Sequence, residues 1–175
     1  AYGRVAQILK SVSFVLEIMH PSPYQFIMNS TYKTICKAFE GFTHRFADGE
    51  QLAALLLGAR KVINRFGSLN ECFVKGMSPE DETVIPAMTF FAKHLIAGKN
   101  NPGHLVPLPE RGSACKRMNL FLRWMARKDK VDPGGWEKVP WSKLIVPLDT
   151  HMHKISFDLG LTRLKQANMG TALEI

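Results

Sequence analysis

Signals that begin and end helices recur along this chain and constrain its fold more than any other feature. Asp48 followed by Gln51 is a capping-box pattern that begins a helix, and Gly67 is a typical residue at which such a helix ends. Further helix starts follow at Ser68 with Glu71 and at Ser78 with Pro79. Strand signals are weak in comparison, since the best candidate, Leu144 to Val146, is very short. We therefore expect an all-α fold.

Apolar residues fall at helical spacing near the start of the chain and again after Asp48. The first stripe ends before Pro21 and consists of Val5, Ile8, Leu9, Val12, Leu16 and Met19. The second stripe consists of Leu52, Leu55, Leu56, Ala59 and Ile63. We expect both stripes to face the core. The helix that begins at Ser78 is expected to reach Gly98 with a kink at Pro86.

The chain has 175 residues, which is the size of one domain, and no shift in composition divides it. We expect a single helical domain over 1–175. It comprises a helical body at 1–103, a hairpin-like turn and basic helix at 104–128, an inserted loop at 129–147, and an aspartate-bearing helix with the start of a C-terminal helix at 148–175. Because the chain begins at Ala1 without a methionine and ends inside an expected helix, we expect a domain truncated at one or both ends.

Composition excludes several classes of protein. Hydrophobic residues make up 46% and charged residues 22%, which is typical of a globular chain and too apolar for a disordered one. No apolar stretch is long and unbroken enough to cross a bilayer. Cys36, Cys72 and Cys115 form no CxxC pair, and their odd number argues against a secreted disulfide framework. We expect a cytoplasmic protein with no metal, no cofactor and no membrane partner.

Positive charge is concentrated in one segment. The chain carries a net charge of +8, and residues 111–130 hold seven basic residues and one acid, Asp129, so this segment supplies six of the eight charges. A solvated helix face is one interpretation of such a run, and a binding site for a polyanion is the other.

A helix over 113–127 would separate these charges from its apolar residues. Its core side consists of Ala114, Met118, Phe121, Leu122 and Met125. Lys116, Arg123 and Arg127 gather on the opposite side, with Arg117 on the flank. Because three stacked cations repel one another, an anion over them would stabilise the helix, and phosphate is the obvious anion. The turn 109–113 would also direct backbone N–H groups outward.

Three short motifs carry a resemblance to a known group of proteins. LPERGSACKRMN at 108–119, PLDTH at 147–151 and LGL at 159–161 resemble a divergent helix-hairpin-helix base-excision DNA glycosylase. More narrowly, GSACKR, FLRWM and PLDTH together resemble an uncharacterised bacterial family regarded as a remote relative of those enzymes. The resemblance covers 104–175 and implies the helix-hairpin-helix glycosylase fold, duplex DNA as the partner and a place at the bacterial nucleoid.

The resemblance also implies roles for individual residues. In the glycosylases a glycine hairpin binds DNA phosphate through its backbone, a nearby lysine is the nucleophile of bifunctional members, and an aspartate is the catalytic carboxylate. Carried over to the matching positions, this makes Lys116 and Asp149 catalytic. The residues expected to bind DNA are Gly112, Ser113, Arg117, Arg123, Arg127 and His151.

The sequence departs from the glycosylase pattern at two points. If Gly112 is the first hairpin glycine, Lys116 occupies the lysine position and the apolar stripe stays inside; if it is the second, no lysine does. We prefer the first register on the packing argument. The 33 positions from Lys116 to Asp149 are also more than usual between these motifs, which is why 129–147 looks like an insertion.

Structural roles compete with each of these functional roles. Asp149 before a helix is also an ordinary N-cap, and Lys116 could be a solvated or phosphate-contacting side chain. Trp136 and Trp141 could stack on an unpaired base or pin the inserted loop to the body. Three functions stay open: a DNA glycosylase with or without lyase activity, a non-catalytic DNA-binding module, and a helical protein-interaction domain with a basic face.

Overall fold

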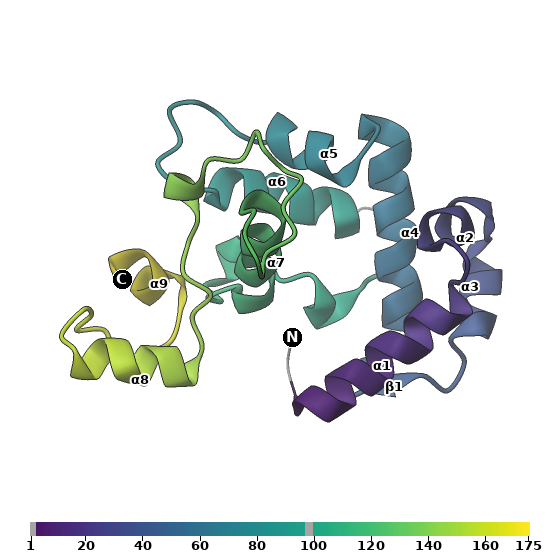
Figure 1. Cartoon of the computed structure of the whole chain (residues 1–175), viewed down its shortest axis with the longest axis horizontal. Helices are drawn as coiled ribbons and strands as arrows, with labels where there is room; N and C mark the ends of the chain where they lie inside the picture. Colours follow the sequence, from purple (N-terminus) through teal and green to yellow (C-terminus); the bar gives the residue numbers. More distant parts are fainter. Residues whose placement is uncertain (1–2, 97–99) are drawn as a thin grey trace. The chain divides into compact units, whose positions relative to one another are not determined.

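The structure, a computed structural model, describes residues 3–96 and 100–175 and is predominantly helical (Figure 1). In chain order its elements are α1 (Val5–Ile18), α2 (Pro23–Asn29), α3 (Tyr32–Ala38), β1 (Thr43–His44), β2 (Ala47–Asp48), α4 (Gly49–Phe66), α5 (Leu69–Lys75), α6 (Ile85–Ile96), η1 (Gly103–Leu105), η2 (Pro109–Arg111), α7 (Lys116–Ala126), η3 (Trp141–Lys143), α8 (Thr150–Asp158) and α9 (Met169–Glu174). The two strands pair antiparallel through two residues each. The expected all-α class is confirmed.

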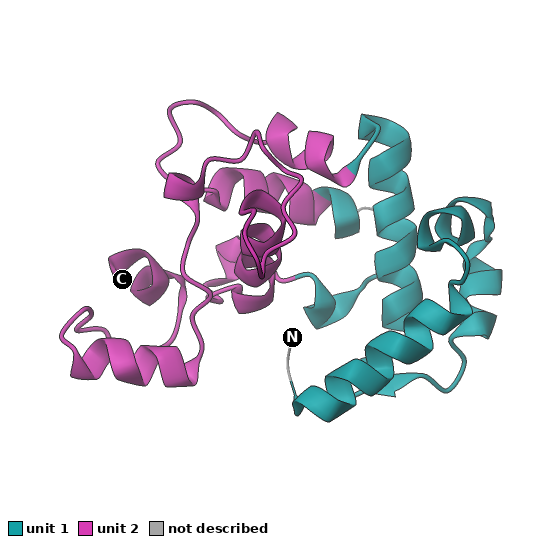
Figure 2. Ribbon diagram, in the orientation of Figure 1, with its two compact units in different colours: residues 1–68, 94–106 teal, residues 69–93, 107–175 magenta. Residues whose placement is uncertain are grey.

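The chain divides into two compact units (Figure 2). Unit 1 consists of residues 1–68 and 94–106, and unit 2 of residues 69–93 and 107–175. Helix α6 contributes to both. The single domain expected over 1–175 stays a prediction.

Helix α4 organises unit 1, and its start follows the predicted pattern. The Asp48 carboxylate accepts a hydrogen bond from the Gln51 N–H at 2.8 Å, and the Gln51 side chain accepts one from the Asp48 N–H at 3.3 Å. Gly67 ends the helix with φ 86°, a conformation that costs glycine little. Both ends of α4 are therefore confirmed.

The buried face of α4 is displaced from the predicted one. The buried residues are Gly49, Ala53, Ala54, Leu57, Gly58 and Val62, whereas the predicted stripe from Leu52 to Ile63 is only half-buried. A Cβ at Gly49 would collide with the Phe39 carbonyl oxygen, and one at Gly58 with the Leu95 carbonyl oxygen. The backbone of Phe39 and Leu95 thus packs closely against the glycines of α4. The leucines of the predicted stripe lie beside these contacts and are only half-buried.

The first predicted apolar stripe is wrong as a core element. Helix α1 contains no buried residue, and Val5 and Leu9 are 72% and 61% exposed. Val12 and Leu16 are also exposed, and Ile8 is half-buried. Only Met19, just after the helix, joins the core cluster with Ile35, Phe39 and Ala53. Helical spacing identified the helix correctly but could not say what would cover it.

Unit 2 is built around Trp136, which is only 5% exposed. Its ring centroid lies 5.5 Å from that of Phe73, 6.2 Å from that of Phe91 and 5.2 Å from that of Phe121. These rings come from α5, α6 and α7, so Trp136 pins the inserted loop to three helices. Of its two predicted roles, the structure bears out the structural one.

Two further expectations for unit 2 are corrected. Ser78 does not begin a helix: its N–H donates to the Asp81 carboxylate at 2.8 Å, and α6 begins only at Ile85, with Pro86 in its first turn rather than at a kink. The expected end at Gly98 lies outside the described residues. Leu144 to Val146, the weak strand signal, continues from η3 without regular structure, in agreement with the expected all-α fold.

The short helix expected from Ser68 is present as α5, Leu69–Lys75. Among the described residues, no helix is both long and apolar enough to cross a membrane.

The packing of Trp136 predicts a large effect of truncation. We expect Trp136→Ala to lower the free energy of unfolding by about 3–5 kcal/mol, because it removes a buried aromatic side chain and leaves a cavity. Trp141→Ala is the matched control: its side chain is 61% exposed, and it contributes chiefly one hydrogen bond from its indole N–H to the Ala126 carbonyl oxygen at 2.9 Å. Urea unfolding of both variants tests this, and equal losses would contradict the pinning role.

Candidate functional site

A tight turn precedes α7 in unit 2. Gly112 adopts a left-handed conformation with φ 76° after the single turn of η2, and its N–H donates to the Pro109 carbonyl oxygen at 3.0 Å. The Gly112 carbonyl oxygen accepts the Met169 N–H at 3.2 Å, and Ser113 forms a β-bridge with Asn168. The turn expected from the sequence is therefore present, preceded by η2 rather than by an α-helix, and joined to the start of α9.

Helix α7 begins at Lys116, three residues later than the sequence predicts. Cys115 is left-handed with φ 47°, and no side chain caps the helix. The side-chain Nδ2 of buried Asn119 donates to the Ala114 carbonyl oxygen at 3.0 Å and holds the turn against the helix. Burial raises the pKa of the Cys115 thiol, so this cysteine is a packed side chain rather than a thiolate.

The core side of α7 largely follows the prediction. Ala114, Met118 and Leu122 are buried, while Phe121 and Met125 are half-buried. In contrast, the apolar residues Met152 and Ile155 of α8 and Leu159 at its C-cap are 39%, 55% and 69% exposed, and Ser156 is the residue of α8 that is buried.

Asp149 precedes α8 and uses its two carboxylate oxygens for different purposes. Oδ1 accepts the Met152 N–H at 2.9 Å, which is the N-cap interaction expected at a helix start. Oδ2 lies 2.6 Å from the Lys116 Nζ. The side chains of Lys116 and Asp149 are 37% and 33% exposed, so the pair is open to solvent on one side. The structure thus brings the two residues expected to be catalytic into direct contact, and Asp149 is an N-cap as well.

The surroundings of Asp149 keep its carboxylate ionised. The hydrogen bond from Lys116 lowers the pKa of Asp149 most, followed by the hydrogen bond from the Met152 N–H, and the positive charges of Lys116 and His151 act in the same direction. Burial acts in the opposite direction, with a smaller effect than either hydrogen bond. His151 itself is exposed on the first turn of α8.

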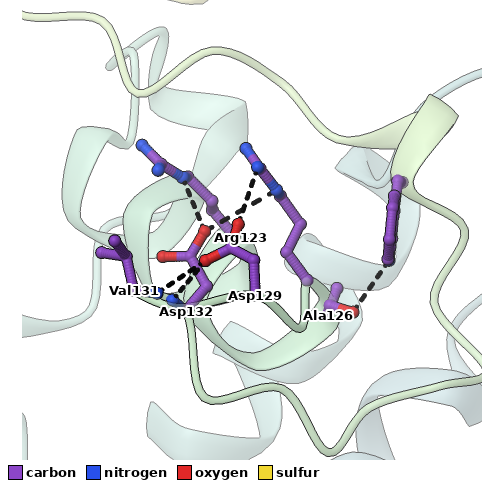
Figure 3. Close-up of polar contacts among 7 residues, drawn as sticks. Arg123, Ala126, Asp129, Val131 and Asp132 are labelled. Atoms are coloured by element: carbon purple, nitrogen blue, oxygen red, sulfur yellow. Dashed lines mark hydrogen bonds and ion pairs between the residues drawn. The ribbon is translucent and has the colours of Figure 1, made fainter.

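The other two cations of the expected stripe are held by carboxylates of the loop after α7 (Figure 3). Arg123 Nε donates to Asp132 Oδ2 at 3.1 Å, and Arg127 Nε lies 3.7 Å from the same oxygen. Arg127 Nη2 donates to Asp129 Oδ2 at 2.9 Å. Asp132 is completely buried. The chain's own carboxylates therefore relieve the repulsion between these cations. Repulsion on the helix face is thus no longer a reason to expect a bound phosphate.

Sequence reasoning missed Asp129 and Asp132 because it counted the first only as a reduction in charge and assigned the second to a turn. The signal was present: two carboxylates three residues apart follow immediately after Arg123 and Arg127. Hydrogen bonds from the N–H groups of Asp132 and Val131 lower the pKa of Asp129, so it too stays ionised.

The remaining predicted positions are partly accessible. Gly112 and Ser113 are exposed, and Arg117 is half-buried. Among the described residues, no group of three potential metal ligands comes together. The roles of Gly112, Ser113, Arg117, Arg123, Arg127 and His151 in binding DNA stay predictions.

Unit 1 contains a cavity that sequence reasoning did not find. Its volume is about 630 Å³, and Lys10, Ser11, His44 and Arg45 are among its lining residues. Ser11 Oγ and His44 Nδ1 are hydrogen-bonded at 2.8 Å. The signal for it was weak, because these residues come from α1 and the β1–β2 turn and form no motif.

These features define a helical protein with a lysine–aspartate ion pair beside a left-handed glycine turn. The chain belongs to a family described as protein of unknown function, DUF2400, whose family model matches residues 1–175. No curated protein and no solved structure gives a significant match.

The lowered pKa of Asp149 predicts a pH-dependent contribution to stability. A carboxyl whose pKa is lower in the folded than in the unfolded chain stabilises the fold above its unfolded pKa of about 3.9, and this contribution is lost as pH falls through the folded value. Asp149→Asn keeps the N-cap but loses the ion pair, so we expect it to be less stable than the natural chain by under about 1 kcal/mol at pH 7.

The difference between the two proteins should shrink as pH falls below about 4. Urea unfolding at several pH values measures it. A difference that stays constant down to pH 2.5, or grows, would show that the ion pair does not contribute in this way.

Proposed function

We propose that this protein binds duplex DNA and cleaves the N-glycosidic bonds of damaged bases, with or without subsequent strand cleavage. The observation that carries the proposal is the contact between Lys116 Nζ and Asp149 Oδ2 at 2.6 Å, beside the Gly112 turn. Two residues 33 positions apart, both expected from the resemblance to face the same sugar carbon, are hydrogen-bonded to each other and so lie close enough to reach one atom. The resemblance of 104–175 to helix-hairpin-helix glycosylases supports the same chemistry and fold.

Asp149 suits the hydrolytic step. When the bond between C1′ and the base nitrogen breaks, its electron pair leaves with the base and positive charge develops on the sugar. An ionised carboxylate stabilises that charge and orients the water that adds to C1′. The water gives up one proton and the departing base takes one up, so the products are a free base and an abasic site. The lowered pKa of Asp149 keeps the required ionised form present at neutral pH.

Lys116 suits the covalent alternative. A neutral amine attacks C1′, displaces the base, and forms a Schiff base after the sugar ring opens, which permits elimination of the 3′ phosphate. In the ion pair the amine is held as ammonium, so its proton must first leave. The Asp149 carboxylate at 2.6 Å stabilises the ammonium, and its lowered pKa makes it a poor proton acceptor, so this proton passes to water or to the departing base.

DNA binding would begin at the turn and the start of α7. The Gly112 N–H is already bonded to Pro109, so the turn would present the backbone of exposed Ser113 to a phosphate, and no side chain caps the amino end of α7. Arg117 lies in the first turn of that helix. Arg123 and Arg127 are about 40% exposed although they bind Asp132, so they can contact phosphate only as already neutralised groups. A cytoplasmic, nucleoid-associated location follows from this proposal.

Specific observations favour the other two functions. The pairing of Lys116, Arg123 and Arg127 with carboxylates fits a non-catalytic DNA-binding module in which these residues only stabilise the fold. The exposed Ile155 and Leu159 of α8 fit a helical protein-interaction domain.

Substitution of the ion pair separates these functions. We expect Asp149→Asn to reduce release of damaged bases from duplex oligonucleotides by about 10²–10⁴-fold, which is the usual contribution of a positioned carboxylate. Lys116→Gln should abolish borohydride trapping on abasic DNA. Asp158→Asn and Lys154→Gln are matched controls, because they change the same residue types at exposed positions of α8. Binding without any processing favours the module, and no salt-sensitive binding favours the interaction domain.

The Gly112 turn gives an independent test of DNA binding. Gly112→Ala should cost about 1–2 kcal/mol of stability, because alanine resists the left-handed conformation. Gly67→Ala is the matched control: Gly67 has φ 86°, and a Cβ at either position would meet nothing within 4 Å. We expect similar losses of stability for both variants in urea unfolding. Only Gly112→Ala should weaken duplex binding in a fluorescence-anisotropy titration, and equal affinities would argue against phosphate contact at this turn.

A further inference from the structure

The turn over 128–133, which follows α7, projects an apolar side chain into solvent. Its ends are joined by a β-bridge between Lys128 and Pro133. Val131 is 79% exposed, more than any other large hydrophobic residue in the described part of the chain. A single exposed valine is ordinary on a protein surface. Val131 differs in that its turn is fixed by hydrogen bonds and ion pairs and carries exposed lysines.

The turn is held rigidly from within. Asp129 Oδ1 accepts the N–H groups of both Val131 and Asp132 at 2.8 Å (Figure 3). The Asp132 carboxylate, buried completely, ties the end of the turn to Arg123 and Arg127 of the α7 segment. The Gly134 N–H donates to the Trp124 carbonyl oxygen at 2.9 Å. Val131 is therefore presented in one position relative to α7.

A buried carboxylate is an energetically unfavourable way to hold a loop that only connects two helices. Burial of a carboxylate is expensive unless its partners compensate fully, and Asp132 Oδ1 has no hydrogen-bond partner among the described residues. The result is a turn held in one conformation, with the Val131 side chain at its tip outside the core.

The charge around the tip indicates what it would meet. Lys128 and Lys130 are exposed and precede Val131 in the same turn, and within the described residues neither pairs with a carboxylate. The arginines beneath are neutralised by Asp129 and Asp132. An apolar tip that shares its turn with two exposed lysines matches a partner whose apolar interior lies next to anionic groups. Duplex DNA, with stacked bases between two phosphate strands, has this organisation.

We propose that the 128–133 turn is a wedge that inserts Val131 into the base stack of duplex DNA while Lys128 and Lys130 contact phosphates. Local unstacking by an apolar side chain lowers the cost of extruding a nucleotide. This inference rests on the proposed function, because it supplies the step that brings a base out of the duplex.

The test uses the full chain and a duplex that contains 2-aminopurine, whose fluorescence rises when it is unstacked. We expect binding of the natural chain to increase this fluorescence. Val131→Ser should reduce the increase at saturation by about fivefold or more with less than about a threefold change in Kd, since the phosphate contacts remain. Val131→Phe should retain it. Val5→Ser is the matched control, because Val5 is 72% exposed on α1.

The outcomes separate this inference from the proposed function. An unchanged fluorescence increase for Val131→Ser, or no increase when the natural chain is bound, overturns the wedge and leaves DNA binding intact. Failure of the natural chain to bind the duplex at low salt overturns the proposed function and the wedge together. Equal losses for Val131→Ser and Val5→Ser would also overturn the wedge, because the effect would not belong to this turn.

Discussion

The ion pair between Lys116 and Asp149 is the interaction on which the candidate site depends. It joins the first residue of α7 to the N-cap of α8, so one contact fixes the starts of two helices relative to each other. The same carboxylate serves helix capping with one oxygen and the lysine with the other. The carboxylate of the candidate site therefore also stabilises the start of α8.

The second set of ion pairs changes the interpretation of the basic segment. Charge counting treats Arg123 and Arg127 as part of an open cationic surface. In the structure they bind Asp132 and Asp129, so the positive charge that remains near the loop belongs to Lys128 and Lys130 instead. Within the described residues, the cations near the loop that have no carboxylate partner thus lie on the turn after α7 rather than on the helix face.

Most features that depend on neighbours in sequence could be predicted, and those that depend on distant partners could not. The helix start at Ser78 is the local signal that failed, because Ser78 and Asp81 form a turn instead. The capping box at Asp48, the stop at Gly67 and the N-cap at Asp149 each involve residues within one helical turn, and all three are present. Helix α1 was recognised, but its burial was not, because helical spacing says nothing about whether another element covers it. Asp132 pairs with arginines that precede it by a few residues, yet only the path of the loop brings it beneath them. The proximity of Lys116 to Asp149 was expected only through the resemblance to a family.

The link between the Gly112 turn and α9 bears on how the protein is made. The Gly112 carbonyl oxygen and Ser113 pair with Met169 and Asn168, more than fifty residues further along the chain. During synthesis the turn beside Lys116 is complete long before these partners leave the ribosome. It therefore lacks its final hydrogen bonds until more than fifty further residues have been translated.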